Sequence, residues 1–385
     1  MKILIAHNFY QQPGGEDESF RSEAALLEDH GHTVIRYTQH NDAFASMNSL
    51  RAAQVTFWNR RVYSELRALM RRERPDVAHF QNTFPLISPA AYYAARAEGL
   101  PVVQTLRNYR LLCPSAVFFR EGQVCELCAQ HRLKWPSVRY ACYRQSRLAT
   151  AVVALMLWSH HHAGTWQRAI DRYIVLTEFA RQKFVANGLP ASKIAIKPNF
   201  VHPAPAAGDG SGGYALFIGR LSPEKGIETM LEAWQAHSPG LPLKLIGDGP
   251  LRERAQQAAA QHPAITWLGR QPKEQVYSWL QGATCLVFPS LWYEGMPRVI
   301  IEAFATGTPV IASNLGAAAE MIRDGETGLH FRAGDAPDLA AKAAQVFEQP
   351  GDRRQMGKAA RAEFEATYTA ERNYEQLMAI YGPLV

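Results

Sequence analysis

The sequence lacks any apolar run close to the roughly 20 residues that a membrane-spanning helix needs. Its longest, 148–158, contains Thr150 and is stopped by a serine and three histidines. The first six residues form a short apolar run that soon gives way to polar, glycine-rich sequence, which is not typical of a signal peptide. We therefore expect a cytosolic protein.

Cysteine is scarce. The five cysteines are an odd number, which argues against a disulfide framework. Four of them fall within 30 residues, and two of these form a C-x2-C pair with metal-ligand spacing: Cys113, Cys125, Cys128 and Cys142. Three interpretations of these cysteines stay open: a structural zinc that pins the loop 113–142, unligated thiols, or a redox role. The run 160–162 of three histidines is a poor metal site, because consecutive helical residues point about 100° apart.

Several catalytic signatures are missing. The chain has no G-x-x-x-x-G-K-[ST], no H-E-x-x-H and no G-x-S-x-G motif. It also lacks a complete G-x-G-x-x-G with a downstream acid. These absences exclude a P-loop enzyme and disfavour a nicotinamide or flavin site.

Acidic residues are few in the first half. Residues 1–200 hold 25 Lys and Arg against 15 Asp and Glu, whereas residues 201–385 hold 16 against 20. The excess is largest in 51–150, with 16 basic and 6 acidic groups. A basic half favours an acidic partner: a membrane surface, a nucleic acid or a phosphorylated substrate. Arginines on solvated helix faces would give the same charge pattern. The segment 57–74, with a tryptophan and six arginines, is the candidate for a membrane-surface helix, or an ordinary basic amphipathic helix.

Two domains are expected, because 385 residues exceed one ordinary core. Short apolar runs alternate with helical stretches such as 16–29 and 56–72, a pattern that predicts parallel sheets. The predicted strands are 3–6, 33–37, 77–80, 102–106 and 173–176, then 215–219, 243–247, 265–268, 285–288 and 310–312. The segment 202–213 has linker composition. We expect an α/β protein with two doubly wound domains, with ligands at the carboxyl ends of strands in the cleft between them.

The segment 288–302 is the most informative. A predicted strand ends at Phe288, a loop with Glu294 and Gly295 follows, and Pro297 stands where a helix would begin. Free N–H groups at that helix start favour an anion. Glu302 lies further along the helix, so one carboxylate can meet a sugar while the other meets a ribose across a diphosphate. An acidic helix N-terminus without a ligand has the same appearance.

Two glycine-containing loops follow other predicted strands. Arg220 and Lys225 lie in the loop 219–226 and form a suitable cationic pair for two phosphates, or an exposed basic turn. Gly14 and Gly15 follow the first strand and would let the backbone approach a ligand closely.

Taken together, these motifs resemble those of retaining glycosyltransferases of family 4, which have the GT-B fold. The resemblance covers nearly the whole chain. It rests on Glu294-x7-Glu302, the loop 219–226, Pro198-Asn199, the segment 247–250 and the Gly14-Gly15 loop. In the first half the segments 79–85 and 108–114 are similar to those of bacterial enzymes that build surface polysaccharides.

The resemblance implies a role for each motif. Residues 1–203 would bind the acceptor, residues 204–368 would bind the nucleotide sugar, and a helix at about 369–385 would pack back on the first domain. Arg220 and Lys225 would hold the diphosphate, Glu302 the ribose and Glu294 the transferred sugar. The implied donor site also includes Gly15, Gly249, Arg270, Gly295, Met296 and Pro297. The implied acceptor site includes Gly14, Glu16, Asn82 and Asn108.

One position departs from the family. Many members have a histidine that reaches the donor sugar where this chain has Arg107. Arginine is longer and permanently charged, so Arg107 is a catalytic candidate that would touch a phosphate or select another sugar.

We expect a retaining hexosyltransferase, peripheral on the inner face of the membrane, that needs no catalytic metal or other cofactor. It would use a UDP-sugar or, as a second choice, GDP-mannose, and a lipid-linked or oligosaccharide acceptor, with anionic lipid and no nucleic acid as partner. The rivals are a GT-B-fold sugar-nucleotide epimerase and a non-catalytic basic binding module. Rapid release of nucleotide from the donor in the absence of an acceptor would indicate the epimerase. Salt-dependent retention of nucleic acid would indicate the binding module.

Overall fold

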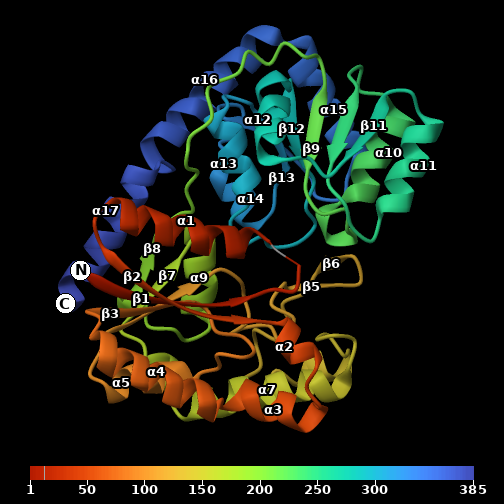
Figure 1. Cartoon of the computed structure of the whole chain (residues 1–385). Helices are drawn as coiled ribbons and strands as arrows, with labels where there is room; N and C mark the ends of the chain where they lie inside the picture. Colours follow the sequence, from red (N-terminus) through yellow and green to blue (C-terminus); the bar gives the residue numbers. More distant parts are fainter. Residues whose placement is uncertain (13) are drawn as a thin grey trace. The chain divides into compact units, whose positions relative to one another are not determined.

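The chain folds into two compact units (Figure 1). The computed structural model describes residues 1–12 and 14–385. The first unit comprises Met1–Phe118, Cys125–Asn199 and Asn373–Val385. The second comprises Phe119–Val124 and Phe200–Arg372.

A six-stranded parallel sheet with the order β2-β1-β3-β4-β7-β8 forms the centre of the first unit. Strands β3 and β4 are buried along their whole length, as expected for parallel strands with helices on both faces. The strands are β1 (Lys2–Phe9), β2 (Thr33–His40), β3 (Val77–Asn82), β4 (Val102–Leu106), β7 (Arg172–Val175) and β8 (Ile194–Ile196).

Helices cover both faces of this sheet (Figure 1). Ile3 and Ile5 of β1 point to one face and pack in a cluster with Phe20 of α1 and Leu377 of α17. Helices α4 and α5 pack together on the opposite face. The helices are α1 (Gly15–Asp29), α2 (Asp42–Ala45), α3 (Ser49–Phe57), α4 (Arg60–Glu73), α5 (Ala90–Ala97), α6 (Trp135–Arg139), α7 (Arg147–His162), α8 (Thr165–Arg168), α9 (Glu178–Ala186) and α17 (Ala370–Tyr381).

The helix predicted over 56–72 is wrong at its start. Helix α3 ends at Phe57, Trp58 is extended, and α4 begins after Asn59. The Asn59 side chain accepts a hydrogen bond from the Val62 N–H, 3.3 Å away, and so caps the new helix. The apolar pattern continues through this break, so periodicity alone predicted one helix where the structure has two.

The second unit has its own six-stranded parallel sheet, with the order β11-β10-β9-β12-β13-β14. The strands are β9 (Ala215–Ile218), β10 (Leu243–Ile246), β11 (Ile265–Gly269), β12 (Cys285–Phe288), β13 (Val310–Ser313) and β14 (Gly328–Phe331). The helices are α10 (Ile227–His237), α11 (Arg252–Gln261), α12 (Lys273–Gly282), α13 (Arg298–Ala305), α14 (Gly316–Met321), α15 (Ala336–Glu348) and α16 (Pro350–Thr367). A small antiparallel hairpin, β5 (Phe119–Arg120) and β6 (Gln123–Val124), is grouped with this unit. Short 3-10 turns are η1 (Ala191–Lys193), η2 (Pro223–Lys225) and η3 (Gly382–Leu384).

The expected fold class is confirmed: each unit is a doubly wound parallel α/β sheet. The edge strands β8 and β14 were not predicted. No helix in the described residues is both long and apolar enough to cross a membrane.

The C-terminal helix contributes core residues to the first unit, so we expect Leu377→Ala to destabilise that unit. The Leu377 side chain is fully buried among strand and α1 residues. Its truncation should lower the free energy of unfolding by about 2–5 kcal/mol, as for other buried leucines. Urea unfolding measures the change. The exposed leucine variant Leu133→Ala is the control and should stay within about 0.5 kcal/mol of the wild type. Equal effects of the two variants would contradict the packing described here.

Candidate functional site

Two loops meet at the carboxyl edge of the second sheet. One follows β9 and contains η2, and the other follows the neighbouring strand β12. The Leu291 N–H donates to the Glu224 carbonyl oxygen across 2.8 Å. Gly226, at a φ of 71°, allows the close approach, because a Cβ there would lie 1.9 Å from the Pro289 carbonyl oxygen. The glycine is therefore required for the contact between the loops.

Lys225 and Glu294 form an ion pair where these loops meet. The Lys225 Nζ donates to Glu294 Oε1 across 2.6 Å. The same oxygen accepts from Ser290 Oγ and Trp292 Nε1, each 2.8 Å away. Glu294 is buried, whereas the Lys225 side chain keeps 22% of its surface exposed. The structure thus brings together two residues that the sequence assigned to the donor site.

Sequence reasoning missed Ser290 and Trp292, the neutral donors to Glu294. Both stand within the segment 288–302, so the signal was present. A loop carboxylate buried beside one lysine needs further donors to satisfy its oxygens. Serine and tryptophan close to it in sequence were the available ones.

The other predicted donor residues surround this edge of the second sheet. Arg220 follows β9 and is exposed. The Gly249 N–H donates to Asp248 Oδ1 across 2.8 Å, and the exposed Arg270 lies 3.9 Å from Asp248 Oδ2. Helix α13 begins directly after Pro297, and Glu302 is half-buried on it. Gly295 and Met296 lie between Glu294 and this helix start.

In the first unit, the Gly14 loop is held by a buried pair. Gly14 is the N-cap of α1, and its N–H donates to Asp17 Oδ2 across 3.3 Å. Asp17 Oδ1 lies 2.8 Å from the ring nitrogen Nε2 of the buried His7. The Gly15 carbonyl oxygen accepts from Ser19 Oγ at 2.8 Å. The loop conformation therefore depends on residues inside α1 and β1.

Glu16 and Asn108, both predicted at the acceptor site, contact each other. Asn108 Nδ2 donates to Glu16 Oε1 across 3.0 Å, and the Tyr10 hydroxyl donates to Glu16 Oε2 across 3.0 Å. Burial raises the pKa of Tyr10 well above its usual value, and the nearby Glu16 charge raises it further. Tyr10 is therefore a neutral hydrogen-bond donor at physiological pH.

Asn82 supports the backbone beside this region. Its Nδ2 donates to the Asn8 carbonyl oxygen at 2.8 Å, and its Oδ1 accepts from the Phe84 N–H at 3.1 Å. Asn82, Arg107 and Asn108 also line one small hollow of about 50 Å³. Three sequence-predicted residues thus lie around one space within the first unit.

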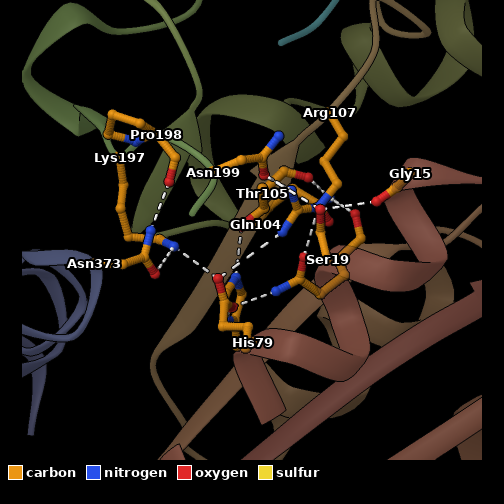
Figure 2. A network of polar contacts seen from close by, with 12 residues as sticks. Gly15, Ser19, His79, Gln104, Thr105, Arg107, Lys197, Pro198, Asn199 and Asn373 are labelled. Atoms are coloured by element: carbon orange, nitrogen blue, oxygen red, sulfur yellow. Dashed lines mark hydrogen bonds and ion pairs between the residues drawn. The ribbon is translucent and has the colours of Figure 1, made fainter. Parts of the chain in front are cut away.

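Arg107 lies in a buried polar network (Figure 2). Its Nε donates to Gln81 Oε1 across 2.8 Å, and a terminal nitrogen donates to Asn199 Oδ1 across 2.6 Å. Another terminal nitrogen lies 3.9 Å from Glu23 Oε2. The guanidinium is thus held by three partners of its own unit, which were not singled out as site residues.

Glu23 is the carboxylate at the centre of this network. Lys197 Nζ donates to Glu23 Oε2 across 2.7 Å and to Asn373 Oδ1 across 2.9 Å. Burial raises the pKa of Glu23, but the charges around it, Lys197 foremost, outweigh burial and bring the pKa to about 2. Glu23 is therefore ionised although it is buried.

His79 lies on the other side of Glu23. Its Nδ1 is 2.6 Å from the Tyr381 hydroxyl, and its Nε2 is 2.7 Å from Thr105 Oγ1. Burial lowers the pKa of His79 to about 4, so the ring is neutral at physiological pH. Asn373 extends the network to α17 (Figure 2). Tyr381 belongs to the same helix and contacts the His79 ring.

In the part of the chain that the structure describes, none of the four clustered cysteines forms a disulfide. Cys113 and Cys128 are buried, and Cys125 and Cys142 are half-buried. Burial raises the pKa of Cys128 to about 12, with a further contribution from Cys113. Among residues 1–12 and 14–385, no group of three or more His, Cys, Asp or Glu is placed to hold a metal ion. A structural zinc stays a prediction.

Two family models match the chain, one for each half. A glycosyl transferase 4-like domain matches residues 14–199, and the glycosyl transferases group 1 model matches residues 206–363. Together with the two doubly wound sheets, these matches show that the chain belongs to the glycosyltransferases of the GT-B fold.

Individual relatives agree with this assignment. An uncharacterised glycosyltransferase of Methanocaldococcus jannaschii is 28% identical over 178 residues, which are 46% of this chain and 50% of that protein. The chain spans about half or less of the length of the first curated relatives it matches.

Two solved structures share the fold over the whole chain. Anabaena HepE in complex with UDP has a TM-score of 0.70 at 18% identity, with 100% of both chains covered. The lipopolysaccharide outer core galactosyltransferase WaaB has a TM-score of 0.66 at 17% identity, also with 100% of both chains covered.

The neutral, buried His79 gives a pH-dependent prediction. Its pKa is about 4 in the folded chain and near 6.5 in the unfolded chain. Between these values the unfolded state binds more protons, so stability falls as the pH drops from about 6.5 to about 4, by about 3 kcal/mol. Urea unfolding across this range should show the loss, and His79→Gln should reduce it by about that amount.

Tyr381→Phe is the control for this experiment. It removes a hydrogen-bond partner of the ring but keeps the histidine, so it should lower stability at every pH and keep the slope. An unchanged slope in His79→Gln would show that the ring is not held neutral.

Proposed function

We propose that this chain is a retaining glycosyltransferase of family 4. It moves a hexose from a nucleotide sugar, preferably a UDP-sugar, to a lipid-linked or oligosaccharide acceptor in surface polysaccharide synthesis. The observation that carries the proposal is the Lys225–Glu294 pair beside the start of α13, in the half that matches the group 1 model. A lysine suits a phosphate and a buried carboxylate suits sugar hydroxyls, so this pair supports a site for a diphosphate sugar.

The second unit binds the donor in this proposal. Lys225 and Arg220 stabilise the negative charge that grows on the departing diphosphate, where preorganised cations lower the barrier most. Glu294 accepts hydrogen bonds from the transferred sugar, and Glu302 accepts them from the ribose. The N–H groups at the start of α13 face the phosphates, with the backbone of Gly295, Met296 and Pro297 alongside. Gly249 and Arg270 lie beside the base.

The first unit binds the acceptor. Gly14, Glu16, Asn82 and Asn108 form the acceptor side, and Gly15 supports the phosphate. Arg107 acts as a positioning residue, because its guanidinium is buried against Gln81, Asn199 and Glu23. This assignment revises its place among the catalytic candidates.

The reaction needs no separate general base. The bond between the anomeric carbon and the diphosphate oxygen breaks, and the acceptor oxygen bonds to that carbon from the same face. The acceptor proton passes to the departing phosphate. The anomeric configuration is kept, and neither a catalytic metal nor another cofactor enters the scheme.

The named relatives support the choice of substrates. The HepE structure contains UDP, and WaaB is a lipopolysaccharide galactosyltransferase. The basic excess in residues 1–200 favours an anionic membrane as the place of the reaction, with the protein peripheral on its inner face.

A donor screen tests the proposal. Thermal shift with UDP-sugars and GDP-mannose should select one donor, since a ligand at 100 times its Kd adds about 2.7 kcal/mol. Proton NMR of the product made from that donor should show the anomeric configuration of the donor. An inverted product would rule out a retaining enzyme, and nucleotide release that needs no acceptor would favour an epimerase.

Lys225→Ala and Arg220→Ala should each lower turnover by about 10²–10³, the effect of losing one donor to transition-state charge. Circular dichroism should show an unchanged fold. Lys273→Ala, which removes an exposed lysine on α12, is the matched control and should keep wild-type turnover. Near wild-type turnover in either variant would remove that residue from the proposed site.

Substitutions of Glu302 and Glu294 should have different effects on UDP binding. Glu302→Gln loses charge-assisted hydrogen bonds to the ribose, each worth about 1.5–3 kcal/mol. Calorimetry should therefore find UDP binding weakened by about tenfold or more. Glu294→Gln should bind UDP nearly as the wild type does and lose sugar transfer instead. Equal loss of UDP affinity in both variants would contradict this division of roles.

A further inference from the structure

Helix α7 exposes apolar side chains to solvent. It carries no charged residue between positions 148 and 159, and a helix that is apolar all round is normally covered on every side. Val153 and Leu157 are buried, but Leu148 is 69% exposed and Leu155 is 47% exposed. Trp158 lies on the same exposed stripe at helical spacing. The stripe is therefore formed by apolar side chains of a kind that is normally buried.

A hollow of about 460 Å³ adjoins the stripe. It lies between α3 and α7, which pack side by side (Figure 1). Leu148 and Val152 line it from α7, and Leu50, which is 83% exposed, lines it from α3. Phe44 and Met47 complete its apolar wall.

Exposed apolar residues concentrate in this part of the chain. Eight of the twelve large apolar side chains exposed in the described residues stand at position 50 or between 127 and 158. Those outside α3 and α7 lie on or near α6, which packs against α7. Their concentration distinguishes this surface from the scattered apolar residues of an ordinary surface.

The charges in the segments that form this surface are mainly basic, although the exposed Asp42 lies on α2 two residues before Phe44. Residues 127–170 contain six Lys and Arg and no Asp or Glu, and residues 43–56 contain one arginine and no acid. Arg144 lines the hollow with its guanidinium over the Phe44 ring, 4.9 Å from its centre. Arg147 is exposed at the start of α7. An occupant with apolar chains and anionic groups matches this combination.

Helix α4, the region favoured by the sequence, is less suited to that role. Arg67 and Arg71 both pair with Glu98, at 2.5 and 2.9 Å. Trp58 packs against Tyr63 and Tyr93. The arginines of α4 are thus partly neutralised within the unit, and Trp58, which precedes the helix, is used in packing.

We infer that the surface formed by α3, α7 and the hollow between them is where the protein binds an anionic phospholipid bilayer. Leu50, Leu148, Leu155 and Trp158 enter the acyl region, and Arg144 and Arg147 contact the phosphate groups. The inference rests on the membrane association in the proposed function, but not on its chemistry.

Vesicle sedimentation without any donor tests the surface. The wild type should bind vesicles of phosphatidylcholine mixed with phosphatidylglycerol, bind pure phosphatidylcholine less, and dissociate as salt rises. Leu155→Glu should lower the partition coefficient about tenfold, because a charge replaces a leucine that enters the acyl region. Phe347→Glu introduces the same charge at a similarly exposed position in the second unit and should change binding less than about twofold.

A charge-matched pair locates the headgroup contacts. Arg144→Gln with Arg147→Gln should weaken binding to the mixed vesicles several-fold more than Arg71→Gln with Arg72→Gln, although the net charge is the same. Leu148→Phe should retain binding. Equal effects of the two arginine pairs, or equal effects of Leu155→Glu and Phe347→Glu, would overturn the inference.

Other occupants give different results. If the wild type sediments as a dimer that Leu155→Glu dissociates, while vesicle binding is unchanged, the surface joins two copies and the inference is wrong. Binding of dispersed short-chain phosphatidylglycerol without vesicle binding also overturns it. UDP binding and sugar transfer to an acceptor free in solution, measured on the same variants, should be unaffected. If the wild type neither binds UDP nor transfers sugar, the proposed reaction is wrong. If only vesicle binding is absent, the membrane association and this surface are wrong.

Discussion

The negative charge of Glu23 lies in the interior of the first unit, and much of the unit is arranged around it. A buried carboxylate is tolerated only when cations and hydrogen-bond donors compensate for its lost hydration. Lys197, Gln81 and Arg107 supply these groups from three different segments of the chain. Loss of any one partner would leave the buried carboxylate less well compensated, so the stability of the unit depends on these segments folding together.

This constraint also fixes the end of the chain. Lys197 shares its ammonium group with Asn373, and His79 contacts both Glu23 and Tyr381. Leu377 adds apolar burial between the two polar contacts. Helix α17 is thus attached to the first unit by polar and apolar contacts together, although its residues follow the second unit in sequence.

The second unit uses a carboxylate differently. Glu294 is buried but sits at the edge of the sheet, where its lysine partner remains partly exposed. Charges that are half-open to solvent can exchange partners, whereas the network around Glu23 is closed. The partly exposed pair around Glu294 suits a binding site, whereas the closed network around Glu23 suits a structural core. We therefore propose a binding role for Lys225 and a positioning role for Arg107.

The sequence by itself determined the fold class and the loops that carry the candidate site. Alternating strands and helices, and the motifs around Lys225 and Glu294, are local patterns that one segment can display. The sequence did not determine the break at Asn59, because a single cap overrides a continuous apolar period. It missed the partners of Glu23, which lie 58 and 174 residues away and meet only through tertiary packing. Likewise, the arginines of α4 and the leucines of α7 were equally visible in sequence. Only the tertiary structure decided which were paired or buried and which were left in solvent, because burial and ion pairing depend on neighbours that the sequence places far apart.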